Sequence, residues 1–212
     1  MSRLQTHAKW KLENQPVCSR PNLHLLLCML NTHSLRAHTN DIVNDYDIID
    51  SNILCLQEVH LPPSHTNILD KYNSHTLYHI HGITTFVTNN LQVLNIKEHK
   101  TQNSEAITLT LPHHAIKYNV TNICIWPNTP INDILAIMTD IFTYPVQQTT
   151  LFIIGDFNLD MSNENKKTKR LIQHMKQHNT QFSLNKTHTP NRPLIDHIWT
   201  NSIGNICSTY TT

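Results

Sequence analysis

The apolar residues of this chain gather in short runs that end at polar residues. Four such runs are Leu23–Leu30, Ile53–Gln57, Thr150–Ile154 and Leu194–Thr200. Runs of this length are typical of buried β-strands and too short for helices. The longest uninterrupted one, Leu25–Leu30, is far below the roughly 18 residues that a membrane span needs. The pattern favours a strand-rich domain and predicts no membrane partner.

Helices are expected between and after these strands. An apolar face at helical spacing runs through Ile131–Phe142, between Pro130 and Pro145, which would bound the helix. Two further helices are expected over 34–50 and 162–178. A pair of strands around Gly82 is predicted over 76–88, and further strands over 91–96, 106–111 and 116–126. Several strands are thus neighbours in sequence, which indicates an α/β sandwich with mixed sheets rather than a doubly wound parallel sheet.

The length of 212 residues fits one large domain or two small ones. No repeat or low-complexity linker divides the chain, so one domain over 23–212 is expected, after a polar lead-in over 1–22. Charged residues make up 15% and the net charge is +1. Simple nucleic-acid binders are usually basic, because phosphate contacts supply their affinity. Near-neutral charge argues against that class, but less against a nuclease whose metal ion carries positive charge.

The five cysteines indicate a reducing compartment. Their number is odd, no CxxC pair occurs, and Cys28, Cys55 and Cys124 lie inside apolar runs. Buried thiols of this kind are usual in proteins of the nucleus or cytoplasm. The first residues also lack the apolar core of a secretory signal. A nuclear or cytoplasmic location is therefore expected.

Polar side chains follow the four main runs, and they are the candidate site residues. Asn31, Glu58 and the pair Asp156 and Asn158 each follow a strand, and Asp196 lies in the last run. Strand ends that meet at one edge of a sheet are where α/β proteins place their sites. Mg²⁺ takes one or two carboxylates and keeps several waters, which suits Glu58. Asp156 suits activation of a water. Taken singly, each residue has the alternative interpretation of a turn or helix cap.

Four motifs resemble those of the endonuclease/exonuclease/phosphatase superfamily, which is deoxyribonuclease I-like. The run Leu30–Arg36 is similar to its N-x-x-S/G-L-R opening, and Ile53–Glu58 to its D-I-x-x-L-Q-E motif. Ile153–Asn158 contains the G-D-F-N motif, and Leu194–Thr200 resembles I-D-x-I-x-x-S/T. The resemblance covers about residues 23–201. Gly-Asp-Phe-Asn with Leu-Gln-Glu upstream is the most specific part.

The resemblance implies a four-layer α/β sandwich, with two mixed β-sheets face to face and helices outside. It implies hydrolysis of DNA with Mg²⁺, or with Mn²⁺ as the alternative ion. Glu58 would bind the metal, Asn31 would contact metal-bound water or phosphate, and Asp156 would activate the attacking water. Asn158 would orient Asp156 and the phosphate. Asp196 would be the carboxylate that pairs with a catalytic histidine.

Within this superfamily, the Ile-Asp-His-Ile form is most similar to the endonuclease domains of LINE-like retrotransposons and Helitron-type mobile elements. That subgroup implies an endonuclease associated with a reverse transcriptase. The chain would then be a monomer or part of a larger polyprotein.

Several positions depart from the family pattern. No Ser-Asp-His follows residue 201, so the sequence predicts a domain without its last strand and without the catalytic histidine. His197 adjoins Asp196, but neighbours on a strand point to opposite faces, which makes it a poor replacement. Trp126 replaces the Tyr of a Y-x-P strand end, Asn52 replaces an Asp, and His33 stands where some members carry an Asp.

Two alternatives to the endonuclease therefore stay open. One is a catalytically inactive relative that acts as a binding domain. The other is a phosphatase or phosphodiesterase of the same fold that acts on a non-nucleic-acid substrate. The basic residues Lys166, Lys167, Lys169 and Arg170 would contact phosphates or form a solvated helix face, and the sequence does not separate the two.

Overall fold

The structure is a computed structural model, and it describes residues 7–12, 25–60, 69–143, 149–182, 194–202 and 206–211. These residues form two six-stranded sheets. Sheet A has the order β12 (Ile206–Thr211), β1 (His7–Leu12), β2 (Leu25–Asn31), β3 (Ile53–Gln57), β5 (Ile83–Thr88) and β4 (Tyr72–Leu77). Sheet B has the order β10 (Gln181–Phe182), β11 (Asp196–Thr200), β9 (Thr149–Asp156), β8 (Ile116–Ile125), β7 (Ser104–His113) and β6 (Asn95–Thr101).

Each sheet contains one parallel pair among antiparallel neighbours. In sheet A, β2 and β3 are parallel, and the connection between them carries α1 (Leu35–Asn44) and α2 (Tyr46–Ile49). In sheet B, β8 and β9 are parallel and are connected through α3 (Ile131–Thr143). A parallel pair needs such a crossover connection, because a tight hairpin turn joins only antiparallel strands. Both sheets are therefore mixed, as expected.

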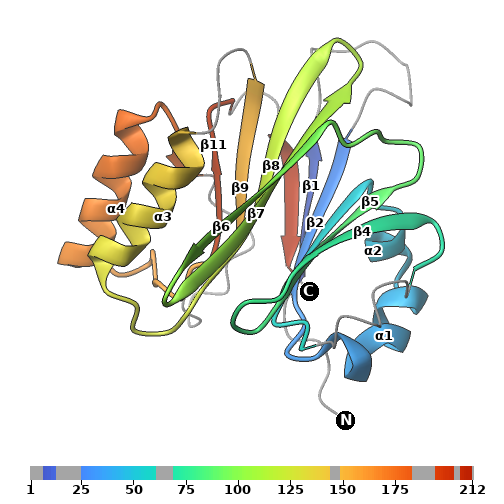
Figure 1. Cartoon of the computed structure of the whole chain (residues 1–212), viewed down its shortest axis with the longest axis horizontal. Helices are drawn as coiled ribbons and strands as arrows, with labels where there is room; N and C mark the ends of the chain where they lie inside the picture. Colours follow the sequence, from blue (N-terminus) through green and yellow to red (C-terminus); the bar gives the residue numbers. More distant parts are fainter. Residues whose placement is uncertain are drawn as a thin grey trace.

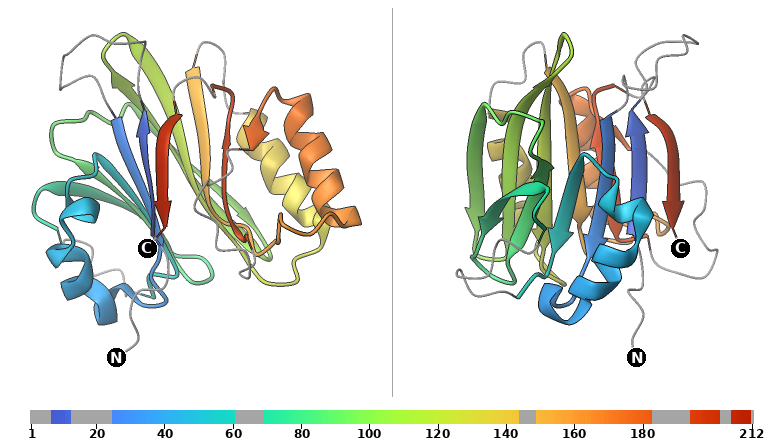
Figure 2. Two further views of the ribbon diagram at one scale, coloured as in Figure 1. Left: turned by 180° about the vertical axis from the view of Figure 1, so that it is seen from behind. Right: turned by 90° about the vertical axis from the view of Figure 1, so that its right-hand side faces the viewer.

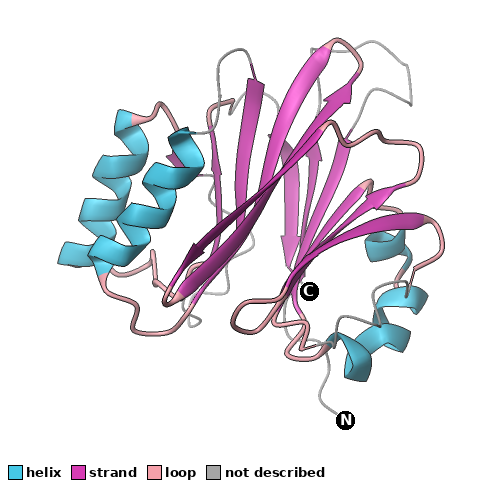
Figure 3. Cartoon of the chain, in the orientation of Figure 1, coloured by secondary structure: helices cyan, strands magenta, loops and turns pink. Residues whose placement is uncertain are grey.

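The layers follow the order helices, sheet, sheet, helices (Figure 1). Helices α1 and α2 lie outside sheet A, whereas α3 and α4 (Lys166–Gln177) lie outside sheet B. The views from behind and from the side show the same arrangement (Figure 2). Coloured by secondary structure, the molecule has its two helical layers at the outer edges and strands between them (Figure 3). The four-layer α/β sandwich with mixed sheets is confirmed.

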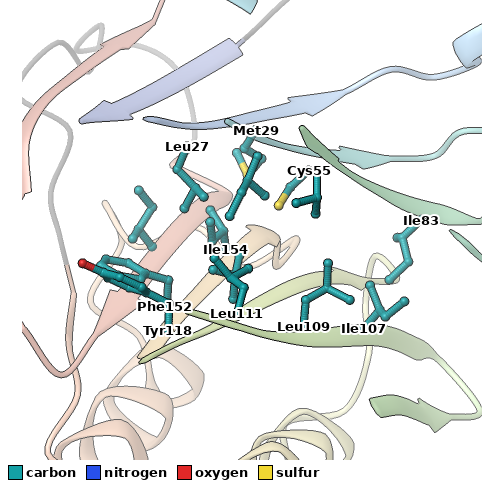
Figure 4. Packing of buried hydrophobic residues seen from close by; sticks show 14 of the residues in the cluster. Leu27, Met29, Cys55, Ile83, Ile107, Leu109, Leu111, Tyr118, Phe152 and Ile154 are labelled. Atoms are coloured by element: carbon teal, nitrogen blue, oxygen red, sulfur yellow. The ribbon is translucent and has the colours of Figure 1, made fainter. Parts of the chain in front are cut away.

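Three apolar clusters fill the spaces between the layers. The largest lies between the two sheets and includes Leu27, Met29 and Leu109 (Figure 4). A second joins sheet B to α3 and α4, and a third joins sheet A to α1 and α2. A strand buried on both faces reads as a continuous apolar run, because alternate residues enter different cores. In β9, Phe152 points into the central cluster and Ile153 into the helical one.

The structure departs from the sequence predictions at several element boundaries. Residues 7–12 form β1 inside the region predicted as a polar lead-in, and they pair with both β2 and β12. The helix expected over 34–50 is two helices, because the Asp45 side chain accepts the Ile48 N–H and starts α2. The strand expected over 91–96 lies at 95–101, where it pairs with β7 across a tight turn.

Helix α4 begins at Lys166 rather than at residue 162. Asn165 caps it by accepting the N–H groups of Lys167 and Thr168, and Thr168 returns a bond to the Asn165 N–H. This reciprocal capping box fixes the start of the helix.

Among the described residues, no helix is long and apolar enough to cross a membrane.

Candidate active site

The two sheets meet at a cluster of polar side chains at the ends of β2, β3 and β9. The Asn31 amide nitrogen lies 3.1 Å from Glu58 Oε1 and 2.9 Å from Asp156 Oδ2, and it donates to both. Asn31 and Glu58 belong to the sheet A side, whereas Asp156 ends β9 of sheet B. Asp196 is the cross-strand partner of Asp156 in the register of β11 with β9. The structure thus brings together these four predicted residues, from segments far apart in sequence.

Glu58 is the carboxylate of this cluster whose surroundings most favour the ionised form. Burial opposes its ionisation, but hydrogen bonds from Asn31 and His33, with the nearby charges of His33 and His81, lower its pKa below the usual value. His33 Nδ1 lies 2.6 Å from Glu58 Oε2. The backbone of Glu58 has φ 52°, a conformation that a residue with a side chain adopts only where its surroundings hold it.

Asp156 is only 2% exposed and accepts two hydrogen bonds. Its Oδ1 accepts the Asn158 N–H at 2.9 Å, and its Oδ2 accepts the Asn31 amide. Burial is the main cause that raises its pKa to about 6, and the neighbouring Glu58 charge adds to the rise. A carboxyl with such a pKa is charged at neutral pH but is a stronger base than an ordinary aspartate.

Asp196 lies beside Asp156 and is partly exposed. Burial raises its pKa to about 7, and the charges of Asp156 and Glu58 push it in the same direction. Among the residues that the structure describes, no hydrogen bond reaches the Asp196 carboxylate. Three carboxylates in mutual repulsion form a site where positive charge is strongly favoured.

The turn after β9 depends on two residues that permit unusual backbone. Asn158 has φ 47°, and its side-chain amide donates to the Ile125 carbonyl at 2.8 Å, which ties the turn to the end of β8. At Gly155, a Cβ would lie 1.8 Å from the Ile123 carbonyl oxygen, and φ is 153°. Only glycine allows this close approach of β9 to β8. The Gly-Asp-Phe-Asn motif therefore allows the backbone conformation of this turn, in addition to supplying the Asp156 carboxylate.

His197 points away from the site, as predicted. It is fully buried on the opposite face of β11, with Nε2 2.7 Å from the Leu159 carbonyl oxygen and its ring stacked on Phe157. Burial lowers its pKa to about 4. His197 is therefore a neutral packing residue that fixes the loop after β9.

Two buried polar residues that the sequence did not single out support the site. The Asn122 side chain, on β8, contacts Gln57 and donates to the carbonyls of Leu56 and Thr84, so it fastens sheet B to sheet A. The buried Glu105 carboxylate, on β7, accepts four backbone N–H groups from residues 79–82. Each is in mid-strand or at a strand start, without a local motif that marks it.

The donor set fits a hard divalent cation of the Mg²⁺ type with few protein ligands. Glu58 supplies one ionised carboxylate, and Asp156 supplies a second within reach of the same Asn31 amide. Mg²⁺ commonly takes one or two carboxylates and completes its shell with water. No group of three or more His, Cys, Asp or Glu in the described parts of the chain is close enough to hold a metal by protein ligands alone. The Asn31 oxygen accepts the His33 N–H, so its amide nitrogen faces the carboxylates.

The basic stretch at the start of α4 has local partners. Arg170 donates to Asn132 of α3 at 2.8 Å, and Lys169 lies 3.7 Å from Glu164. Both contacts are on the exposed helical layer. Contact of these residues with phosphate stays a prediction.

The four-layer arrangement of two mixed sheets between helices is a deoxyribonuclease I-like fold. Solved structures share it. The endonuclease domain of TRAS1, a telomere-specific non-LTR retrotransposon, matches with a TM-score of 0.63 and 12% identity over 82% of each chain. The human Nocturnin catalytic domain matches with a TM-score of 0.59 and 16% identity, over 78% of this chain and 75% of that one.

An endonuclease/exonuclease/phosphatase family protein from Leptotrichia buccalis matches with a TM-score of 0.57 and 12% identity, over 83% of this chain and 87% of its own. No family model matches the sequence, and no curated protein does. At these identities the likeness is one of fold, and it confirms the fold that the motifs predicted.

Proposed function

We propose that this chain is a Mg²⁺-dependent phosphodiesterase that cleaves DNA as an endonuclease of the mobile-element type, with Mn²⁺ as the alternative ion. The observation that carries the proposal is the cluster of three carboxylates. The Asn31 amide bridges Glu58 and Asp156, and Asp196 is the cross-strand partner of Asp156. Such a set of carboxylates would repel a phosphodiester unless a cation were bound. The fold likeness to the TRAS1 endonuclease domain supports the choice of DNA.

Each residue has a definite task in this proposal. Glu58, with its lowered pKa, would hold the ion, which supplies charge neutralisation at the phosphate. Asp156 is held by the Asn31 amide and the Asn158 N–H, and would accept a proton from the attacking water. Asp196, with a pKa of about 7, can hold or release a proton near neutrality, which suits a group beside the leaving oxygen.

The cysteines support a reducing compartment, the nucleus or the cytoplasm. Cys28, Cys55 and Cys124 are buried free thiols in the described part of the chain. Burial raises the pKa of the Cys124 thiol well above its usual value, and the surrounding carboxylates add to this, so it stays protonated and unreactive.

The proposal is tested by nicking of supercoiled plasmid DNA with Mg²⁺ and with EDTA. The parent should nick only with Mg²⁺, and Glu58→Gln and Asp156→Asn should each lower the initial rate at least about 100-fold, the usual range for a lost general base. Asp41→Asn, on the exposed face of α1, is the matched control and should nick like the parent.

Equal nicking by the parent and both site variants would refute the assignment of the site, and absence of Mg²⁺-dependent nicking would refute the DNA endonuclease. Hydrolysis of a small phosphodiester without DNA cleavage would instead favour the phosphodiesterase on a non-nucleic-acid substrate.

A further inference from the structure

Three rings lie beside the carboxylates but have no part in the proposed chemistry. The centroids of the His81 and Trp126 rings are 4.6 Å apart, and those of His60 and His81 are 5.1 Å apart. Trp126 is 42% exposed, which is unusual for so large an apolar side chain, and His60 is exposed as well. An exposed tryptophan in contact with other rings is a common mark of a binding surface.

The backbone under each ring is fixed by hydrogen bonds. The His60 N–H donates to the His81 carbonyl at 3.0 Å, and the Trp126 N–H donates to the Asn103 carbonyl at 2.9 Å. The Glu105 carboxylate holds the loop that carries His81 through its four bonds to residues 79–82. A surface whose backbone is already ordered loses little entropy when a ligand binds.

The rings do not cover one another. The planes of His81 and Trp126 meet at 63°, and those of His60 and His81 at 81°. In such edge-to-face contacts, neither ring can cover both faces of its neighbour. Because Trp126 is also 42% exposed, part of its ring surface is open to a flat ligand.

The ring cluster is continuous with the candidate active site. Val59 and His60 directly follow Glu58, and their N–H groups donate to the Gly82 and His81 carbonyls at 3.1 and 3.0 Å, so the loop that carries His81 lies alongside the segment after Glu58. Trp126 directly follows Ile125, whose carbonyl accepts the Asn158 side-chain amide. A strand with one phosphate at the carboxylates would have a neighbouring nucleotide within reach of the rings.

We propose that His60, His81 and Trp126 form a stacking platform for an unpaired nucleobase next to the phosphate that is cleaved. This inference rests on the proposed function, and it adds the class of substrate. In a duplex the faces of each base are covered by its neighbours, so only an unpaired or displaced base can stack on a protein ring. Stacking on aromatic side chains contributes about 1–3 kcal/mol per base and tolerates any sequence. The preferred substrate would be single-stranded or locally opened DNA.

The test compares oligothymidylate with an abasic strand of the same length and charge. Binding is measured by fluorescence anisotropy with Ca²⁺ to neutralise the carboxylates, and a gel afterwards shows that the strand is intact. The parent should bind oligothymidylate about 10-fold more tightly than the abasic strand, as about 1.4 kcal/mol of stacking implies.

Trp126→Ala should lose this preference without changing affinity for the abasic strand, and Trp126→Phe should keep most of it. His81→Ala tests the same surface from a second residue and should reduce the preference. Tyr46→Ala, which removes a ring that is 83% exposed on α2, is the matched control and should bind like the parent.

The platform is overturned if the parent binds both strands equally, or if Trp126→Ala weakens both equally. Plasmid nicking in parallel separates the two proposals. A preference for oligothymidylate without plasmid nicking would support the stacking platform and refute the endonuclease proposal. Nicking without that preference would support the endonuclease and refute the platform.

Discussion

The three carboxylates of the site differ in charge state because their surroundings differ. Glu58 receives hydrogen bonds from Asn31 and His33, which lower its pKa. Asp156 and Asp196 are partners across β9 and β11, and desolvation raises their pKa values to about 6 and about 7. Environments that separate the pKa values of neighbouring acids are typical of sites that transfer protons.

The raised pKa of Asp196 predicts a pH-dependent cost to stability. The folded protein holds a proton on this group up to about pH 7, whereas the unfolded chain releases it near pH 4, so stability falls as pH rises through this window. With EDTA present, Asp196→Asn should therefore melt above the parent, and its advantage should grow from about pH 5 to pH 8.

A difference of about 2–4 °C for each kcal/mol is expected for a chain of this size, measured by differential scanning calorimetry. The comparison with the parent removes the opposing effect of buried histidines such as His197, whose pKa is lowered. A melting difference that does not change with pH would contradict the prediction.

Only some of these residues could be found from the sequence. Asn31, Glu58, Asp156 and Asn158 each follow an apolar run within a motif, and in the structure Asn31 bonds both Glu58 and Asp156. The pairing of Asp196 with Asp156 depends on the register of two strands 40 residues apart in sequence (Asp156 to Asp196). Neither Glu105 nor Asn122 has a local signal, because each binds backbone that is distant in sequence.

At the scale of elements, the loop after β4 is held by a strand of the other sheet. Glu105, at the start of β7, accepts the N–H groups of residues 79–82 that lead into β5. A buried carboxylate with four donors is satisfied, whereas a buried charge without them would be very costly. This contact positions the loop that carries His81.

Replacement of Glu105 should therefore cost more stability than its single side chain suggests. Glu105→Gln leaves one acceptor oxygen for four N–H groups and should lower the free energy of unfolding by about 2 kcal/mol or more. Urea unfolding measures this, and Glu98→Gln, an exposed glutamate on β6 of the same sheet, is the matched control. Equal midpoints for the two variants would show that the Glu105 contacts contribute little.

Element boundaries were the part of the fold that sequence patterns predicted least well. The alternation of Ala8, Trp10 and Leu12 with polar residues has the period of a strand, but the segment is short and its neighbours are polar. Its place between β2 and β12 comes from backbone pairing with them. The break between α1 and α2 likewise depends on how one side chain, Asp45, bonds to the backbone.

At the scale of the whole molecule, the site exists only because the two sheets pack face to face. Asn31 on sheet A bonds Asp156 on sheet B, and Asn122 on sheet B bonds Leu56 and Thr84 on sheet A. The central apolar cluster holds the sheets in this position. Neither sheet alone carries both Glu58 and Asp156, so the proposed metal site depends on residues from both sheets.

Binding of Mn²⁺, followed by the loss of the free-ion electron paramagnetic resonance signal, tests this central claim directly. The parent should bind the ion, and Glu58→Gln on sheet A and Asp156→Asn on sheet B should each weaken binding about 10-fold or more, the effect expected for loss of a ligand or its close partner. Asp41→Asn should bind like the parent. If Glu58→Gln and Asp156→Asn bind Mn²⁺ as tightly as the parent, the two sheets do not form a shared metal site.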